Sequence, residues 1–172
     1  RHRHAIGVPI NRRCIMVTRR KSPEGVWEAL RGIFDPEIPV ISIVDMHIVS
    51  VIEATEDSVS VELTPTFSGC PALDHIKDEI RTALAAIGYE RIEIRTNFTK
   101  AWTTDLLDDE TREKLRIFGI APPVKVEWDL ASMLAKPVPC PFCSSEQTLL
   151  ESAFGPTLCK QIFYCDSCRQ SF

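Results

Sequence analysis

The strongest hydrophobic pattern in the chain lies between residues 73 and 87. Apolar side chains recur there every three or four positions, at Leu73, Ile76, Ile80, Ala83, Leu84 and Ile87. This spacing places them on one face of a helix, and the glycine that follows is a common type of helix end. We therefore predict an amphipathic helix over this segment.

An earlier helix is predicted to begin at Ser22. Serine is a favoured N-cap and Pro23 suits the first helical position. The apolar positions that follow are Val26, Trp27, Leu30 and Ile33. The helix must end before residues 35–39, because each of the two prolines there pushes its predecessor toward extended geometry and removes a backbone donor. We predict a stiff loop at residues 35–39 that carries two carboxylates, Asp35 and Glu37.

Alternation of apolar and polar residues predicts three strands. Residues 48–54 and 58–64 indicate a hairpin with its turn at residues 56–57, and residues 91–98 indicate a third strand. A short charged helix is expected over residues 105–119, ended by Gly119. The order of helix, β-hairpin, helix and strand is typical of a small α+β domain.

Two Cys-x-x-Cys pairs lie near the end of the chain. Cys140 and Cys143 are followed after 21 residues by Cys165 and Cys168. Two such turns can present four thiolates to one tetrahedral Zn²⁺, and four thiolates leave no open position for a catalytic water. Residues 147–154 and 159–164 can pair as strands between them, so we predict a zinc ribbon with a structural metal ion. A rubredoxin-like iron site and a redox pair of motifs use the same residues and are the alternatives.

Charged residues are distributed unevenly between the start of the chain and the rest of it. Residues 1–23 hold seven Lys or Arg and no acidic residue, which leaves the rest of the chain with a net charge of −11. We predict a basic, disordered arm at residues 1–21, a main domain at 22–123, a linker at 124–135 and the zinc ribbon at 136–172. The acidic body disfavours nucleic-acid binding.

Other sequence features bear on the compartment. No apolar run reaches the roughly 18 residues that a membrane-spanning helix needs, and the first residues lack the pattern of a secretory signal. Four of the seven cysteines fall into pairs with metal-ligand spacing, which is typical of a reducing compartment. We expect a cytoplasmic protein that does not bind membranes.

Cys70 is the main candidate for chemistry in the larger domain. It precedes Pro71 at the predicted start of the helix over residues 73–87, where unpaired amides and the helix dipole would lower a thiol pKa. Such a thiol is a nucleophile or a metal ligand, and a cysteine that only packs explains the residues equally well. His75 and His47 are expected to be structural. No Ser-His-Asp set or phosphate-binding glycine loop indicates an enzyme.

Cys159 is a fifth cysteine within the predicted zinc ribbon. Four ligands are already available, so it is either a small strand residue or a participant in metal relay. Its neighbour Lys160 would favour the thiolate if the side chain is exposed.

Two loop motifs resemble those of the metal-sulfur cluster assembly domain family. They are Asp35-Pro36-Glu37-Ile38-Pro39-Val40, continued by Ser42-Ile43 and Asp45-Met46, and Thr64-Pro65-Thr66-Phe67-Ser68-Gly69-Cys70-Pro71. More narrowly, residues 101–105, residues 118–123 and the four-cysteine ribbon resemble the D-protein family of bacterial phenylacetyl-CoA epoxidase systems. One departure is His47, where the family's motif usually has glycine, and a tolerated change in the loop is the expected explanation.

The resemblance implies an accessory factor of aerobic phenylacetate catabolism rather than an enzyme. Such a factor would help to mature the epoxidase by delivering iron or an iron-sulfur cluster to a reductase or oxygenase component. Cys70 would be a transient ligand, with Asp35, Glu37 and Thr66 shaping the site. Whether the chain acts as a homodimer stays open.

Two other functions compete with this one. The first is a permanent, non-catalytic structural subunit of the oxygenase complex. The second is a thiol enzyme that pairs Cys70 with His75 or His47, which is disfavoured because no orienting partner can be identified.

Overall fold

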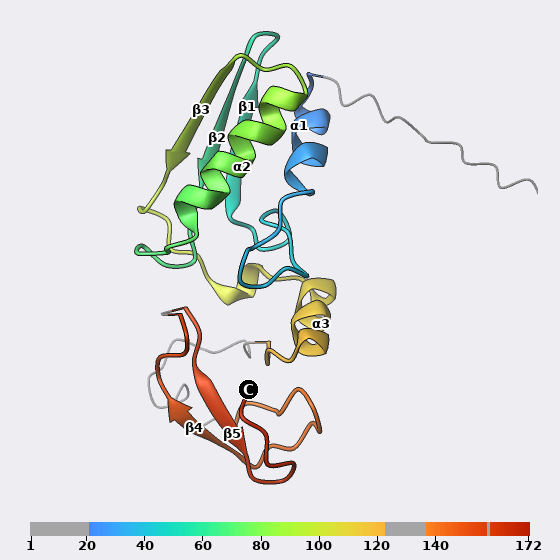
Figure 1. The fold of residues 1–172 in the computed structure, drawn as a ribbon, viewed down its shortest axis with the longest axis vertical. Coiled ribbons are helices and arrows are strands. Elements are labelled where there is room, and N and C mark those ends of the chain that lie inside the picture. The colour runs from blue at the N-terminus through green and yellow to red at the C-terminus, as the bar shows by residue number, and fades with distance from the viewer. Residues whose placement is uncertain (1–20, 123–136, 158) are drawn as a thin grey trace, which may run out of the picture.

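The computed structural model describes residues 21–122, 137–157 and 159–172. The predicted basic arm, apart from its last residue, and the predicted linker lie outside these residues. The first unit contains α1 (Pro23–Leu30), β1 (Val49–Ala54), β2 (Ser58–Leu63), α2 (Leu73–Ala86) and β3 (Arg91–Thr96). A 3₁₀ turn η1 (Thr104–Leu106) and α3 (Asp109–Phe118) follow, and β4 (Thr148–Ser152) and β5 (Ile162–Cys165) form the second unit (Figure 1).

Helix α1 begins as the sequence predicts. The Ser22 hydroxyl oxygen accepts a hydrogen bond of 3.0 Å from the backbone N–H of Gly25, and Pro23 occupies the first turn. The helix ends at Leu30, well before the proline loop. Val26 and Leu30 are completely buried on the inner side of the helix, which is where the apolar spacing places them.

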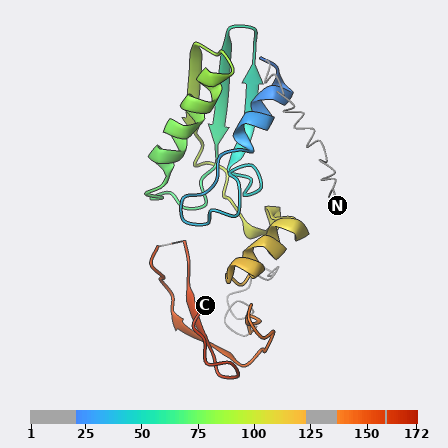
Figure 2. The same ribbon diagram turned by 45° about the vertical axis from the view of Figure 1, so that its right-hand side comes forward.

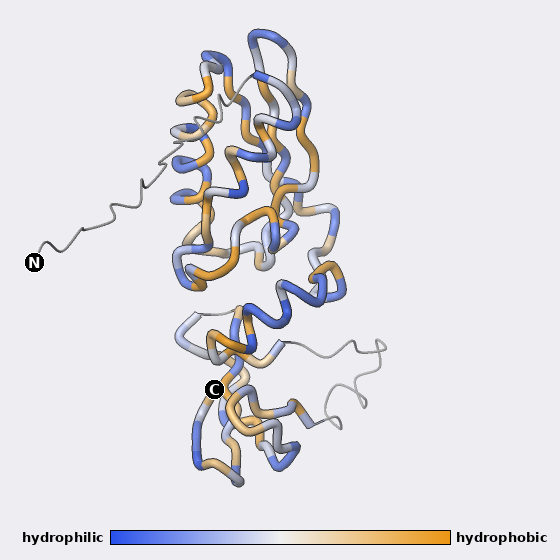
Figure 3. The backbone as a smooth tube through the Cα atoms, turned by 90° about the vertical axis from the view of Figure 1, so that its right-hand side faces the viewer, coloured by the Kyte–Doolittle hydropathy of each residue, from blue (hydrophilic) through white to orange (hydrophobic). Residues whose placement is uncertain are grey.

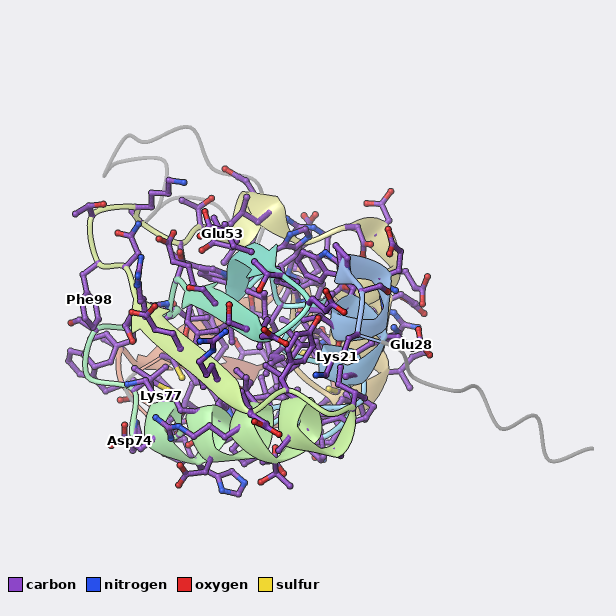
Figure 4. The ribbon with its side chains drawn as sticks, turned by 90° about the horizontal axis from the view of Figure 1, so that it is seen from above. Lys21, Glu28, Glu53, Asp74, Lys77 and Phe98 are labelled. Carbon is purple, nitrogen blue, oxygen red and sulfur yellow. The ribbon has the colours of Figure 1, made fainter. Side chains whose placement is uncertain are left out.

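The three strands of the first unit form one sheet in the order β1-β2-β3. β1 and β2 are antiparallel, as expected of a hairpin, whereas β2 and β3 are parallel because α2 carries the chain back to the starting end of the sheet. Val59, Val61 and Leu63 of β2 are buried on one face. Both helices lie on that same side of the sheet when it is viewed from above, and Glu53 of β1 lies on the other side (Figure 4).

Helix α2 confirms the strongest sequence pattern. Ile76, Ile80 and Leu84 are at most 1% exposed, and the remaining faces are polar. Along helix α2, hydrophobic and hydrophilic residues accordingly alternate, whereas most residues of α3 are hydrophilic (Figure 3). Gly88 follows α2 with a φ of 99°, a left-handed conformation that suits glycine at a helix end.

The predicted helix over residues 105–119 is divided in two. Asp108 has an extended backbone and its carboxylate accepts a hydrogen bond of 2.8 Å from the N–H of Thr111, so α3 begins at Asp109 rather than at 105. Gly119 ends α3 with a φ of 94°, as predicted. Arg112 joins α3 to η1 by donating to the carbonyl oxygens of Leu107 and Thr104. The mixed helices and strands confirm the α+β class.

Two contacts hold the segment after β3 against the long loop between α1 and β1. The indole N–H of Trp102 donates to the carbonyl oxygen of Met46 at 2.7 Å, and Lys114 Nζ lies 3.3 Å from Asp45 Oδ2. The loop is itself part of the core, because Ile41 and Ile43 are fully buried. The loop that carries the predicted carboxylates is therefore firmly placed at the lower end of the first unit (Figure 1).

Within the described residues, none of the helices has the length and apolar character required to cross a bilayer.

Candidate metal sites

The four cysteines predicted as metal ligands come together in the second unit. Their Sγ atoms all lie within 4.8 Å of one another, and the Sγ atoms of Cys140 and Cys168, like those of Cys143 and Cys165, are 3.6 Å apart. Four sulfurs at about 2.3 Å from a tetrahedral zinc ion are separated by about 3.8 Å. The four thiols therefore fit one four-coordinate metal ion.

The two Cys-x-x-Cys turns have matching backbone geometry. The N–H of Ser144 donates to the carbonyl oxygen of Cys140, and the N–H of Arg169 donates to that of Cys165, at 2.8 and 2.9 Å. Ser144 and Arg169, each directly after the second cysteine of its pair, both have a φ of 61°. Each turn thus bends its two sulfurs toward the same point.

Two of the four thiols have pKa values that are shifted in opposite directions. Backbone N–H groups of Cys168 and Ser167 that donate to the sulfur of Cys165 lower the pKa of that thiol to about 7. Desolvation, together with the neighbouring Cys140 and Cys143, raises the pKa of Cys168 to about 12. A metal ion with two positive charges removes this conflict, because it holds all four groups as thiolates.

Cys70 lies in the loop between β2 and α2, away from the four-cysteine set. Its N–H donates to the carbonyl oxygen of Phe67, and its own carbonyl accepts from the N–H of Leu73, so it occupies a tight turn just before the helix. The side chain is half-buried and the thiol is free. The turn holds the sulfur near the surface at the N-terminal end of α2.

The expected low pKa of Cys70 is wrong. Desolvation by burial raises the pKa, and a hydrogen bond from the N–H of Ala72 to the sulfur only partly opposes it. The negative charges of Cys159, Asp35 and Glu37 raise the pKa further. In addition α2 begins at Leu73 with Ala72 as its N-cap, so Cys70 is not the cap residue.

Two of the predicted companions of Cys70 act on it electrostatically. Asp35 and Glu37 both stand among the charges that shift its pKa. Asp35 Oδ1 also accepts hydrogen bonds from the N–H groups of Glu37 and Ile38 at 2.8 and 2.9 Å, which stabilises the proline loop. Thr66 is half-buried in the same loop as Cys70. These placements are compatible with the predicted site, and the ligand role of the residues stays a prediction.

Neither histidine is placed as a base for Cys70. His75 is exposed and lies 3.7 Å from Glu79 on the same helix. His47 is exposed and has a φ of 52°, a left-handed conformation in which glycine is favoured. The turn expected at His47 is therefore kept, although the residue is not glycine.

Sequence reasoning missed a contact between the two units. Lys160 Nζ lies 3.5 Å from Glu37 Oε2, so the lysine beside Cys159 pairs with the carboxylate loop. A second contact lies at α3, where Arg116 donates to the carbonyl oxygen of Pro141 at 3.3 Å. No local pattern in the sequence indicates which residues meet across two separate units.

Two family models match the chain. The model described as an iron-sulfur cluster assembly protein matches residues 23–94, and the model described as the PaaD zinc beta ribbon domain matches residues 129–172. The second match agrees with the geometry of the four cysteines. The first covers both loops that carry Asp35, Glu37 and Cys70.

Two curated relatives match different lengths of the chain. A protein of Escherichia coli (strain K12), provisionally named as the D component of 1,2-phenylacetyl-CoA epoxidase, is 40% identical over 147 residues, which cover 86% of this chain and 88% of the relative. A protein of Porphyromonas gingivalis (strain ATCC BAA-308 / W83), named Fe-S protein maturation auxiliary factor, is 29% identical over 97 residues, or 55% of this chain and 91% of the relative.

A solved structure supports the fold of the first unit. A domain of unknown function, DUF59, from Bacillus anthracis matches with a TM-score of 0.51 at 22% identity, covering 55% of this chain and 91% of that structure. The identity to the Escherichia coli protein extends over both units, and the two family models match in the same order as the two units of the structure. As the sequence motifs indicate, the chain belongs to the D-protein family of phenylacetyl-CoA epoxidase systems, with an iron-sulfur cluster assembly domain followed by a zinc ribbon.

Proposed function

We propose that this protein is a non-catalytic maturation factor of phenylacetyl-CoA epoxidase that carries iron or an iron-sulfur cluster to a component of that enzyme. The cargo is held transiently at Cys70 and then transferred. The proposal joins two relationships: most of the chain is related to a protein named as an epoxidase component, and about half of it is related to proteins named as Fe-S protein maturation auxiliary factors.

One observation carries the proposal. A free, half-buried thiol lies in the assembly domain, outside the four-cysteine metal site, and the charges of Asp35 and Glu37 raise its pKa. A thiol with a raised pKa is protonated at neutral pH, so metal binding must release that proton, and competition from protons makes the metal easier to release than from a thiol that is already ionised. This property suits a carrier better than a permanent metal site.

The four cysteines of the ribbon serve a different purpose in this proposal. They hold a structural Zn²⁺, because four sulfur ligands close the coordination sphere and tetrahedral sulfur sites favour zinc. The ribbon then presents exposed apolar side chains, including Phe142, Leu149 and Phe154, for docking of an epoxidase component. Aromatic side chains such as Phe142 and Phe154 are enriched at protein interfaces.

The name of the Escherichia coli relative favours a second function. A protein named as a component of the epoxidase can be a permanent structural part of it, and the exposed apolar side chains of the ribbon would then bind within the assembled enzyme. The two functions differ in stoichiometry. A maturation factor is absent from the purified active epoxidase, whereas a structural subunit copurifies in a fixed ratio.

The test is to produce the epoxidase components with either the wild-type protein or Cys70→Ser. Serine can still accept the hydrogen bond from Ala72, so the free energy of unfolding should change by less than about 1 kcal/mol. Oxygen is a poor substitute for sulfur toward iron-sulfur cargo, so the epoxidase should be low in iron, cluster absorbance and epoxidation activity.

Cys14→Ser is the matched control because Cys14 also lies outside the zinc set. It should give a fully loaded epoxidase. Full iron and activity with folded Cys70→Ser protein would contradict the carrier mechanism and favour the structural subunit.

A further inference from the structure

The tip of the zinc ribbon approaches the cysteine loop of the first unit. In two views that differ by 45°, the connection between β4 and β5 points at the end of the first unit where α2 begins (Figures 1 and 2). The ion pair between Lys160 and Glu37 joins the two units at this point, and only about a quarter of each side chain is exposed, at 25% and 29%. The ribbon tip is thus anchored to the carboxylate loop.

Cys159 is carried to the same place by its neighbour Lys160. Its thiol is exposed and free, and it lies 3.3 Å from the hydroxyl oxygen of Thr157 within the ribbon tip. Cys159 is also among the groups whose electrostatic effect raises the pKa of Cys70, after desolvation by burial as the largest cause. Cysteine is thus present on both sides of the junction between the units.

The described cysteine and carboxylate donors at this junction do not form a complete metal coordination shell. Within the described residues, the sole group of three or more His, Cys, Asp or Glu donors within 4.8 Å of one another is the four-cysteine set of the ribbon. Cys70 and Cys159 therefore have no third donor of these types, among the described residues, within that distance of both, so a cargo held by the two thiols would keep coordination positions for sulfide or for a ligand of the receiving protein. An open site of this kind can give up its cargo.

We propose that Cys159 is the second protein thiolate for the cargo held at Cys70, so that the zinc ribbon supplies a ligand to the carrier site in addition to its structural role. The inference rests on the proposed function. The Lys160–Glu37 ion pair supports it, because that contact joins the residue next to Cys159 to the loop of Glu37. Soft thiolates are the ligands that iron-sulfur clusters prefer, and two from one chain hold a cluster better than one.

The first experiment tests the pairing of the thiols without any cargo. Phenylarsine oxide reacts with two thiols. Two arsenic–sulfur bonds replace the arsenic–oxygen bond, and the oxygen leaves as water with the two thiol protons. Zinc-loaded Cys14→Ser protein has only Cys70 and Cys159 outside the zinc set and should retain one arsenical per chain after gel filtration, measured by intact mass. The same protein with Cys70→Ser or Cys159→Ser should retain none.

The second experiment measures the cargo. Zinc-loaded proteins are incubated without oxygen with ferrous iron and sulfide, and iron, sulfide and cluster absorbance are measured after desalting. Cys159→Ser and Cys159→Ala should keep one zinc per chain but bind the cluster at least about tenfold more weakly, since even outer partners of a metal ligand contribute that much to affinity. Cys14→Ser should match the wild type.

The outcomes separate this inference from the proposed function. Equal cluster binding by the wild type and both Cys159 variants would overturn the role of Cys159 and leave the carrier function at Cys70 intact. Failure of Cys14→Ser protein to bridge the arsenical would also overturn it, because the two thiols would then be too far apart. No cluster binding by the wild type would overturn the proposed function, and this inference with it.

Discussion

Cys70 shows how burial and charge can outweigh position at a helix terminus. The sequence places it near the start of α2, which predicts a lowered pKa, but desolvation of the half-buried side chain raises the pKa, and negative charges add to this effect. Desolvation cannot be read from a residue's neighbours in the sequence. The position of Cys70 before the helix made it a candidate and the resemblance of its loop to a family made it the leading one, whereas its electrostatic state required the structure.

The raised pKa of Cys70 predicts its reactivity. Iodoacetamide reacts with the thiolate, so alkylation of Cys70 should be slow at neutral pH and should increase as the pH rises beyond the ordinary pKa of a cysteine. Glu37→Gln removes a negative charge and frees Lys160, and both changes favour the thiolate. The alkylation profile of Cys70 should therefore shift to lower pH, as measured by mass spectrometry of the Cys70 peptide.

Glu56→Gln, in the turn between β1 and β2, is the control for this shift and should leave the profile of Cys70 unchanged. Rapid alkylation of wild-type Cys70 at neutral pH would contradict the raised pKa.

At the scale of elements, periodicity located nearly all of the secondary structure. The long apolar face of α2 and the alternation in β2 gave their elements to within one residue, because buried faces leave a strong pattern in long segments. The parallel pairing of β2 with β3 follows once α2 is accepted as the connection. The break between η1 and α3 was missed, although Asp108 followed by further acidic residues is a typical helix start.

Asp108 should be needed for the stability of α3. Asp108→Ala removes the hydrogen bond to the N–H of Thr111 and should lower the free energy of unfolding by about 1 kcal/mol, whereas Asp108→Asn can keep it. The loss is measured by urea unfolding at neutral pH and by amide exchange within α3.

The pH dependence has a definite sign. Backbone and side-chain hydrogen bonds from Thr111 lower the pKa of Asp108 in the folded protein. The carboxylate therefore stabilises the fold at any pH above its unfolded pKa of about 4, and this contribution disappears as the pH falls through the lower folded value. The advantage of the wild type over Asp108→Asn should vanish in acid, and an advantage that grows in acid would contradict the capping role.

At the scale of the whole molecule, the two units differ in what holds them together. The first unit has a continuous apolar core, with Leu30, Ile43, Leu63 and Ile80 fully buried. In the described part of the ribbon the buried hydrophobic residues are Cys140 and Cys165, which are predicted metal ligands, while Leu149 and Leu150 are exposed. The spacing of the cysteines predicted the separate metal unit, but the contact between Lys160 and Glu37 depends on tertiary docking that no pattern encodes.

This difference predicts a partial unfolding when zinc is removed. Structural zinc contributes about 10 to 16 kcal/mol of binding free energy in small metal-dependent modules, and the ribbon has almost no other core. After chelation, residues 140–172 should lose the protection of their backbone amides, measured by hydrogen exchange, while β2 and α2 remain protected.

Cys143→Ser should have the same effect and lower the zinc content, whereas Cys159→Ser should keep about one zinc per chain. Persistent protection of β4 and β5 in metal-free protein would show that packing alone holds the ribbon, and equal zinc loss in Cys159→Ser would show that the four ligands are wrongly chosen.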